Sequence, residues 1–371
     1  MPRIKIFGAG SIGNHLANAA RTLGWEVVVC DISPEALRRM KAEIYPSRYG
    51  AWDDAIRLFS NRDAPVGGFD LIFIGTPPDV HMQLAMSAID ENPKALLIEK
   101  PLCGPDLEGA NILWQRIREK RIPAFVGYDH AVGAASRLVE GLLAKKTIGP
   151  VLTLDVEFRE HWAGIFKAHP WLRGPSDSYL GFWRRGGGAS GEHSHAINLW
   201  QHFAHIIGAG RVEQVSASLD YVESDGASYD RLALMTLRTE RGLIGRVAQD
   251  VVTLPVSKRA IIQGEEGRIE WVNGYDAAGD AVLVHRPGRD AEVHHLPKKR
   301  PDDFIAELRH VHAHTANGGE SSPIALSRGL DTMLVVAAAH RSSQEETAIR
   351  INYSGGYNLE ALESGPLIGR T

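Results

Sequence analysis

A glycine pattern near the N-terminus constrains the fold of this chain more than any other feature. Gly8, Gly10 and Gly13 form G-x-G-x-x-G, directly after the apolar run Arg3–Phe7 and directly before a helical pattern. In a strand–turn–helix context this pattern indicates a Rossmann dinucleotide site, because glycines permit the tight turn, the approach of a pyrophosphate and the packing of the helix on the sheet. A glycine-rich turn without a ligand is the alternative. The residues that we expect to contact the dinucleotide here are Gly8, Gly10, Ser11, Ile12 and Gly13.

Strands and helices alternate after this turn. Apolar runs that alternate with helical segments are typical of a parallel sheet covered on both faces. The predicted strands are Arg3–Phe7, Trp25–Cys30, Asp70–Gly75, Ala95–Ile98 and Ala124–Gly127, and the predicted helices are Ser11–Leu23, Pro34–Ala42, Asp79–Ile89 and Asp106–Lys120. Residues 1–127 are therefore predicted to form an α/β Rossmann domain.

Asp31 bears on which dinucleotide is bound. It follows the second predicted strand, where a carboxylate accepts hydrogen bonds from the adenosine ribose and repels a 2′-phosphate. This position favours NAD as the cofactor. Arg38 and Arg39 lie nearby in the sequence and leave NADP possible, although we expect them to form a solvated helix face.

The second part of the chain has a different pattern. Eight strand-like segments are joined by turn sequences, which predicts a large, mainly antiparallel sheet. These segments are Val151–Arg159, Val212–Val222, Arg231–Arg238, Leu243–Val252, Arg259–Gln263, Arg268–Val272, Val282–His285 and Glu292–Leu296. Helices are predicted at about Asp302–Ala316 and Ser327–Gln344.

The length of 371 residues predicts two domains. Residues 128–352 are expected to form an α+β domain for substrate binding and oligomerisation, with the helix 327–344 packing back on the Rossmann domain and residues 353–371 as a tail. Several strands, such as Leu232–Met235, are apolar on both alternations. Since an apolar sheet face left in water favours aggregation, we expect a homodimer or homotetramer formed through that face.

Composition excludes several classes of protein. Lys plus Arg number 41 and Asp plus Glu number 45, so no basic excess favours nucleic acid or an anionic membrane surface. No apolar run is long enough to span a bilayer, and the N-terminal segment lacks the hydrophobic region of a signal peptide. The two cysteines, Cys30 and Cys103, are too few for a disulfide framework. We therefore expect a cytoplasmic protein without nucleic-acid or membrane partners.

Four further segments resemble the Gfo/Idh/MocA family of oxidoreductases. They are the loop Gly75–Asp79 with His81, the tripeptide Glu99-Lys100-Pro101, the glycines Gly186–Gly188 followed by Glu192, His195 and Asn198, and the helix Ile324–Ser342. The resemblance implies an open-faced mixed sheet in the second domain and an active site between the domains. The sequence departs from the family pattern in several places: the spacing from the glycines to His195 is one residue shorter than usual, and Asn198 stands where a second Asp is common. Glu192 precedes His195 by three residues where the family has Asp four residues before, and Asp129-His130-Ala131 stands where the family often has Asn-x-Arg.

The resemblance also implies an activity, NAD(P)-dependent hydride transfer to or from a secondary alcohol or ketone of a sugar, sugar acid, nucleotide sugar or cyclitol. Lys100 and His195 would be catalytic, with Glu192 orienting the imidazole. Further cofactor contacts are expected from Thr76, Pro77, Pro78, His81, Glu99 and Lys100. Two alternatives remain open at this point: an NAD-dependent glycosidase that uses transient oxidation, and a non-catalytic NAD-binding regulator.

A long stretch rich in Gly, Trp and Pro, Phe166–Gly191, interrupts the second sheet, and such loops are usually functional. Aromatic rings beside Arg and His suit a polyhydroxylated ring, although a packed lid is an equal alternative. The expected substrate-binding residues are Lys100, His130, His169, Trp183, Arg184, His193 and His195.

Helical spacing predicts which histidine is catalytic. If a helix begins after the glycines with Ser190 as its cap, then Glu192, His195 and Asn198 form one stripe and His193 points about 100° away. The Glu192–His195 segment could also bind zinc, but nicotinamide chemistry with a lysine needs no metal, so none is expected. His310, His312 and His314 lie in a helical segment on which all three cannot share one face.

Overall fold

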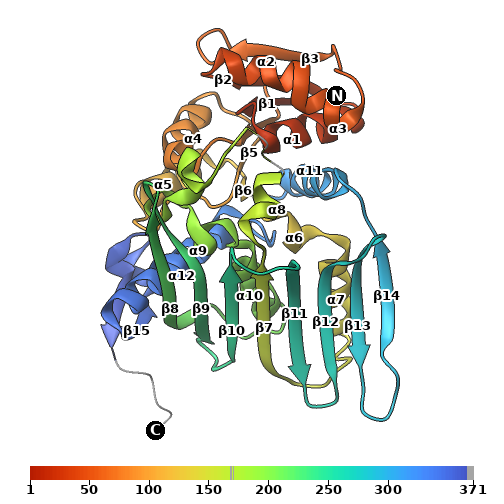
Figure 1. Cartoon of the computed structure of the whole chain (residues 1–371), viewed down its shortest axis with the longest axis vertical. Helices are drawn as coiled ribbons and strands as arrows, with labels where there is room; N and C mark the ends of the chain where they lie inside the picture. The colour runs from red at the N-terminus through yellow and green to blue at the C-terminus, as the bar shows by residue number, and fades with distance from the viewer. Residues whose placement is uncertain (168, 170, 366–371) are drawn as a thin grey trace.

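Two sheets organise the chain in the computed structural model, which describes residues 1–167, 169 and 171–365 (Figure 1). The first sheet is parallel throughout. Its strands are β1 (Arg3–Phe7), β2 (Glu26–Asp31), β3 (Ile56–Ser60), β4 (Leu71–Ile74), β5 (Ala95–Ile98) and β6 (Ala124–Val126), in the order β3-β2-β1-β4-β5-β6. The five predicted strands are confirmed, and β3 is an addition. The chain crosses β1 between β3 and β4, which creates the switch point where Rossmann sheets bind dinucleotides.

Helices cover both faces of this sheet. They are α1 (Ser11–Thr22), α2 (Pro34–Arg39), the π-helical turn η1 (Met40–Ile44), α3 (Tyr45–Tyr49), α4 (His81–Asp90) and α5 (Ala110–Lys120). The helix predicted to end at Ala42 is instead continued by η1 and α3. Pro46 follows η1 in the first turn of α3; a proline has no N–H to donate, and local irregularities of a helix commonly accompany it.

The second sheet has ten strands. They are β7 (Val151–Arg159), β8 (Val212–Ser224), β9 (Ala227–Thr239), β10 (Ile244–Asp250), β11 (Ser257–Gly264), β12 (Arg268–Asp276), β13 (Gly279–His285), β14 (Glu292–Pro297), β15 (Ala348–Ile351) and β16 (Leu362–Gly365). Their order is β14-β13-β12-β11-β7-β10-β9-β8-β15-β16, and β7 with β10 is the parallel pair among antiparallel neighbours. All eight predicted strands are confirmed, and β15 and β16 extend the sheet at one edge.

One face of the second sheet is covered by helices. The remaining helices of the chain are α6 (Asp129–Val132), α7 (Ala134–Ala144), α8 (Trp162–Lys167), α9 (Gly188–Glu192), α10 (His195–Ile206), α11 (Asp302–Thr315) and α12 (Leu326–Glu345). Of these, α7, α10 and α12 pack on the sheet, and alternate residues of β7 such as Leu154 and Val156 are buried beneath α10. Trp200 of α10 donates its indole N–H to the carbonyl of Leu154 at 2.8 Å, which fixes the helix on the sheet.

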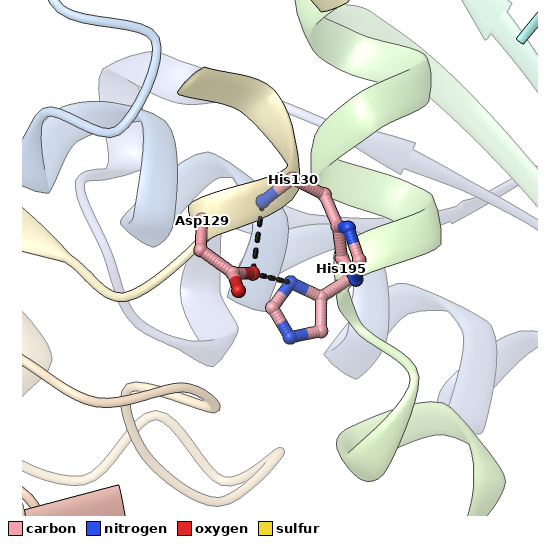
Figure 2. Close-up of side chains that lie close together, drawn as sticks. All are labelled: Asp129, His130 and His195. Carbon is pink, nitrogen blue, oxygen red and sulfur yellow. Dashed lines mark hydrogen bonds and ion pairs between the residues drawn. The ribbon is translucent and has the colours of Figure 1, made fainter. Parts of the chain in front are cut away.

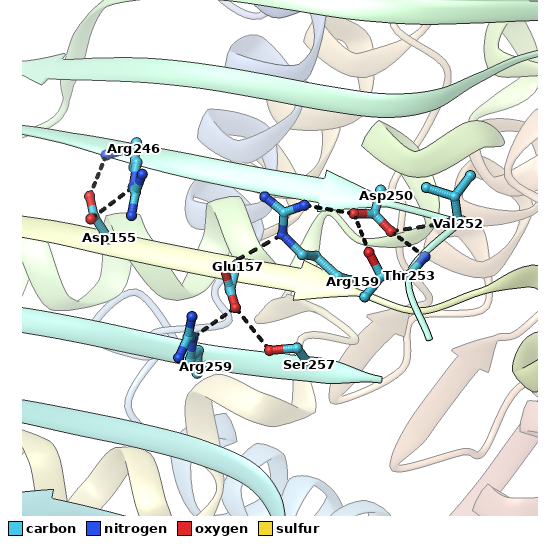
Figure 3. Close-up of polar contacts among 9 residues, drawn as sticks. All are labelled: Asp155, Glu157, Arg159, Arg246, Asp250, Val252, Thr253, Ser257 and Arg259. Carbon is cyan, nitrogen blue, oxygen red and sulfur yellow. Dashed lines mark hydrogen bonds and ion pairs between the residues drawn. The ribbon is translucent and has the colours of Figure 1, made fainter. Parts of the chain in front are cut away.

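The opposite face of this sheet carries ion pairs (Figure 3). Arg246 of β10 pairs with Asp155 of β7 at 2.8 Å, and Arg259 of β11 pairs with Glu157 at 2.7 Å. The expectation of a largely apolar outer face is therefore wrong, because exposed apolar side chains such as Leu234 share this face with ion-paired charged side chains.

The start of α12 joins the two sheets. The amide of Val126, at the end of β6, donates to the carbonyl of Ile324 at 2.8 Å, and a Cβ at Gly329 of α12 would lie 2.3 Å from Val126 Cγ2. On the other side, Phe304 of α11 stacks on His15 of α1 with ring centroids 5.0 Å apart. These contacts bring the carboxyl edge of the first sheet against the helix-covered part of the second. Among the described residues, no helix is both long and apolar enough to cross a membrane.

Candidate active site

The glycine turn between β1 and α1 is shaped for a pyrophosphate. Gly8 has φ +107°, and Gly13 lies so close to it that a Cβ would stand 2.0 Å from the Gly8 carbonyl oxygen. A Cβ at Gly10, by contrast, would meet no atom within 4 Å. No side chain caps α1, so its first N–H groups face outward from an open turn. The turn therefore fits a dinucleotide phosphate at a helix N-terminus.

Asp31 holds this turn against the end of β2. Its carboxylate accepts hydrogen bonds from the amide of Ala9 and the amide of Ser33, both at 2.8 Å. Arg38 is engaged with Glu35 and Glu43, and Arg39 lies over the ring of Trp171 at 5.1 Å. The carboxylate that we predict to contact the ribose is thus held by two backbone amides, whereas the guanidinium of Arg38 is paired with two carboxylates.

Arg48 is a residue at the cofactor turn that the sequence did not reveal. Its guanidinium donates to the carbonyl of Ser11 at 3.0 Å and to the Ser11 hydroxyl at 2.9 Å. The charge stands beside the residue at which α1 begins, where a pyrophosphate would lie. No motif marks Arg48, since it enters the site only through the turn η1 and helix α3.

A cavity of about 600 Å³ opens from this turn toward the second domain. Ser11 and Ile12 line one end, and Lys100, Glu192 and His195 line the other. Of the remaining predicted residues, the walls also include Glu99, His130, His169 and His193. The cavity therefore joins the dinucleotide turn to the predicted catalytic pair.

Lys100 projects from the end of β5 into this cavity. Its peptide bond to Pro101 is cis, and its ammonium donates to the backbone carbonyl of Glu192 at 2.9 Å. The Glu192 carboxylate lies 3.1 Å from the same nitrogen. Burial raises the pKa of the neighbouring Glu99 to about 8, against the opposing effect of Lys100. Gly127 is required beside it, because a Cβ there would stand 2.0 Å from Glu99 Oε2.

Asp129, rather than Glu192, is the carboxylate that faces His195 (Figure 2). Asp129 Oδ1 lies 3.7 Å from His195 Nδ1 and accepts the backbone N–H of His130 at 2.8 Å. The rings of His130 and His195 meet edge to face, 4.8 Å apart. Burial, together with the positive charge of Lys100, holds the pKa of His195 well below its usual range. The imidazole is therefore neutral at neutral pH.

The predicted stripe of Glu192, His195 and Asn198 is wrong because the helix is interrupted. Helix α9 ends at Glu192 and α10 begins at His195, with His193 and Ser194 in the turn between them. The predicted cap is also wrong, because Gly187 is the residue that precedes α9 and Ser190 lies inside the first turn of that helix. There the backbone N–H of Ser190 donates to the carboxylate of Asp230 at 2.7 Å. This break lets Glu192 point to Lys100 and His195 to Asp129.

His193 lies deeper than His195. Its side chain is buried, its carbonyl accepts a hydrogen bond from Gln249, and its Nε2 has no partner among the described residues. Burial, with Lys258 and Lys100 nearby, holds its pKa well below the usual range. His193 thus offers a neutral ring at the wall of the cavity.

Six further predicted site residues lie outside the walls of this cavity. His81 is fully buried, with Nε2 2.7 Å from the carbonyl oxygen of Thr76 and Nδ1 3.3 Å from that of Leu102, so its ring braces the loop after β4. Trp183 stacks on His340 at 4.6 Å and Arg184 lies over Trp183, outside the cavity walls. Thr76, Pro77 and Pro78 follow β4 at the carboxyl edge, also outside those walls.

The described histidines form one metal-compatible group, Asp129, His130 and His195, whose ligand atoms lie within 4.8 Å of one another. The three histidines of α11 do not share a face, as predicted. His310 and His314 stack at 3.9 Å, whereas His312 packs near Trp25 at 5.6 Å.

A Rossmann sheet whose dinucleotide turn opens toward a lysine and a neutral histidine defines an NAD-binding oxidoreductase. Residues 3–128 match the oxidoreductase family with an NAD-binding Rossmann fold, and residues 136–270 match the GFO/IDH/MocA C-terminal domain. The chain belongs to the GFO/IDH/MocA family of oxidoreductases. No curated protein matches it in sequence.

Solved structures share the whole fold at low identity. A levoglucosan dehydrogenase in complex with NADH and levoglucosan is 19% identical, covering 94% of this chain and 98% of its own, with a TM-score of 0.75. An oxidoreductase from Agrobacterium radiobacter with NAD⁺, L-tartaric acid and magnesium is 20% identical, covering 94% and 98%, with a TM-score of 0.73. A myo-inositol dehydrogenase from Corynebacterium glutamicum is 20% identical, covering 95% and 99%, with a TM-score of 0.70.

Proposed function

We propose that this protein transfers a hydride between NAD and a secondary alcohol or ketone carbon of a sugar, sugar acid, nucleotide sugar or cyclitol. The observation that carries the proposal is the single cavity that joins Ser11 and Ile12 to Lys100 and His195. Solved relatives that hold NADH with levoglucosan, or that act as myo-inositol dehydrogenases, support the substrate class.

The two catalytic side chains have separate tasks in this proposal. Bound nicotinamide supplies the acceptor or donor of the hydride. His195 removes the hydroxyl proton, since a neutral imidazole is the form that acts as a base, and Asp129 stabilises the cation that results. Lys100 donates to the oxygen on which negative charge develops. Glu192 holds that ammonium in place through its carbonyl and carboxylate.

The rest of the cavity suits a ring that carries hydroxyl groups. Phe158 and His169 present ring faces and edges, and His130 and His193 present neutral ring nitrogens. Apolar faces with a few convergent polar groups are what a small-molecule site requires. Trp183 and Arg184 are not part of this proposal, because they lie outside the cavity walls.

A screen of sugars, sugar acids and cyclitols with NAD, followed at the NADH absorbance, tests the proposed function. NADH formation with a polyol supports it, and the absence of turnover with every candidate would favour a regulator. Release of a sugar from a glycoside without net NADH would instead indicate the glycosidase chemistry.

We expect Asp31→Ala to weaken NAD binding about tenfold and to remove most of the preference for NAD over NADP. The variant loses the ribose acceptor and also the hydrogen bond that holds the amide of Ala9 in the turn. Titration of the purified variant with both cofactors measures the effect. Asp63→Ala is the matched control, since Asp63 is exposed and bonds locally to Ser60. A wild-type preference for NADP would contradict the role given to Asp31.

We further propose that the outer face of the second sheet forms a homo-oligomer interface. That face carries a shallow hollow of about 1110 Å³ across β7 to β11 and exposes Leu234 and Ile244 between its ion pairs. In a two-fold interface the same patch meets itself, so the rows of charged residues on this face must be self-complementary.

Arg246→Glu, which breaks the pair with Asp155, is expected to shift a dimer or tetramer toward monomer in sizing with light scattering. Arg116→Glu on α5 is the control, and a wild-type monomer at micromolar concentration would contradict the proposal.

A further inference from the structure

A second cavity, of about 320 Å³, lies on the other side of α6 and α10 from the catalytic one. Its walls come from α6, α7, α10, α11, the first two turns of α12, the loop that precedes α12 and the segment just before β8. This volume lies within the range of small-molecule sites in proteins. We propose that this cavity binds a small phosphate-bearing metabolite.

An excess of positive charge is the first observation that carries the proposal: the arginines Arg137, Arg211 and Arg328 line the cavity against the two carboxylates of Glu140 and Asp331. The two carboxylates of the cavity are already engaged, Glu140 with His202 at 2.8 Å and Asp331 with both ends of the Arg211 guanidinium. Arg137 and Arg328 line the same cavity and make no ion pair with a carboxylate anywhere in residues 1–167, 169 and 171–365. Arg137 donates to the carbonyl of Val132, and Arg328 approaches the ring of His205. Burial also holds the pKa of Arg328 below its usual value.

Neutral polar groups surround these two arginines. His310 Nε2 bonds the hydroxyl of Ser322 at 2.7 Å, and burial lowers the pKa of His310 to about 4, so its ring adds polarity without charge. The side chain of Asn198 is an independent sign of a ligand. It is 2% exposed, it lines the cavity, and its amide oxygen has no partner among the described residues. Because an amide oxygen only accepts hydrogen bonds, it would take a hydroxyl group of the metabolite, while the arginines take the phosphate.

Phosphate chemistry fits this set better than a neutral ligand does. A guanidinium fork binds a phosphate through two parallel hydrogen bonds, and two arginines on different helices can approach a tetrahedral anion from different directions. Arg137 comes from α7 and Arg328 from α12, and both line the cavity together with Asn198 of α10. A neutral polyol would leave the excess positive charge of the cavity without a counter-charge.

The position of the cavity couples it to the catalytic site. Helix α6 presents Asp129 and His130 to the catalytic cavity and Ala131 and Val132 to the second one. Helix α10 begins at His195, and Asn198 lies one turn later on the wall of the second cavity. A ligand in the second cavity that reduces the mobility of α6 and α10 would therefore also reduce the mobility of the segments that carry Asp129 and His195.

A ³¹P NMR titration with inorganic phosphate tests the proposal. The full chain is first saturated with NAD, so that the anion-binding N-terminus of α1 is occupied. We expect saturable binding, and we expect Arg328→Gln and Arg137→Gln each to weaken it at least about tenfold. Arg116→Gln, an exposed arginine of α5 paired with Asp90, is the matched control and should bind as the wild type does.

Hydrogen exchange supplies a second readout. Phosphate is expected to slow amide exchange in α6 and α10 in the wild type and to leave it unchanged in Arg328→Gln. NAD affinity shows whether each variant is folded, and if Arg328→Gln fails that check, the variant of the exposed Arg137 is used for the test.

Unchanged phosphate affinity in a folded Arg137→Gln, or slower exchange confined to elements other than α6 and α10, would overturn the site. Equal binding of malonate would overturn the assignment to phosphate. No readout depends on turnover, so the result stands apart from the proposed function.

Discussion

Lys100→Met is expected to lower turnover by about a hundredfold or more, the scale of losing one donor to a developing oxyanion, while NAD affinity stays nearly unchanged. The change removes the ammonium that Glu192 holds at 2.9 and 3.1 Å, and it retains most of the apolar stem. The dinucleotide turn at Gly10 and Ser11 is not disturbed, since the ammonium is bonded to α9 rather than to the turn. Steady-state kinetics with the substrate found in the screen, together with NAD titration, measures both quantities.

Lys258 supplies the matched control for Lys100. It lines the same cavity, but its ammonium is paired with Glu160 at 2.6 Å. Lys258→Met should therefore raise KM without a comparable fall in kcat. A near-normal kcat in Lys100→Met, or an equal fall in kcat for the two variants, would remove Lys100 from the catalytic pair.

Local signals were sufficient to predict most of the fold. The glycine turn at Gly8 and the strand-like alternation of segments such as Val151–Arg159 depend on neighbouring residues alone. The missed strand, β3, lies at the edge of the first sheet, where only Ile56 is fully buried and Arg57 is exposed. An edge strand needs no continuous apolar run, so the sequence pattern could not distinguish it from a loop. Strand β16 was missed within the expected tail for the same reason, since among the described residues its four residues pair with β15 alone.

The candidate site was predictable in its parts but not in its pairing. Lys100 and His195 follow from resemblance, and the structure places both in one cavity. The partner of His195 could not be predicted, because helical spacing assumes an unbroken helix and the chain breaks it between Glu192 and His195. Asp129 reaches the imidazole from a distant part of the sequence, at the first residue of α6, which follows β6.

The composition of the loop Phe166–Gly191 could not show which of its side chains line the cavity. Aromatic and basic side chains suit both a substrate pocket and a packed interface, and the sequence cannot decide between them. Trp183 stacks on His340, whose Nδ1 is 2.7 Å from the hydroxyl of Tyr221, so this tryptophan fills space between α12 and β8. His169 of the same loop does line the cavity.

Replacing His195 by alanine is expected to lower kcat for alcohol oxidation by about a hundredfold or more, the usual scale for a general base. In the wild type, the base must be unprotonated, so kcat/KM rises with pH through the pKa of His195 and is flat above it. Since burial holds that pKa well below the ordinary value of about 6.5, the acid limb should lie on the acid side of that value. His195→Ala should lose that limb.

His193 is the control that decides which histidine carries the proton. It lines the same cavity and is also neutral, but Asp129 faces the ring of His195. An imidazole that becomes cationic in the reaction needs a nearby carboxylate, and this requirement selects His195. His193→Ala should therefore raise KM, leave kcat within a few fold and keep the acid limb of the wild type. If His193→Ala instead abolishes the limb while His195→Ala keeps it, the proton passes through His193 and the Asp129–His195 contact is structural.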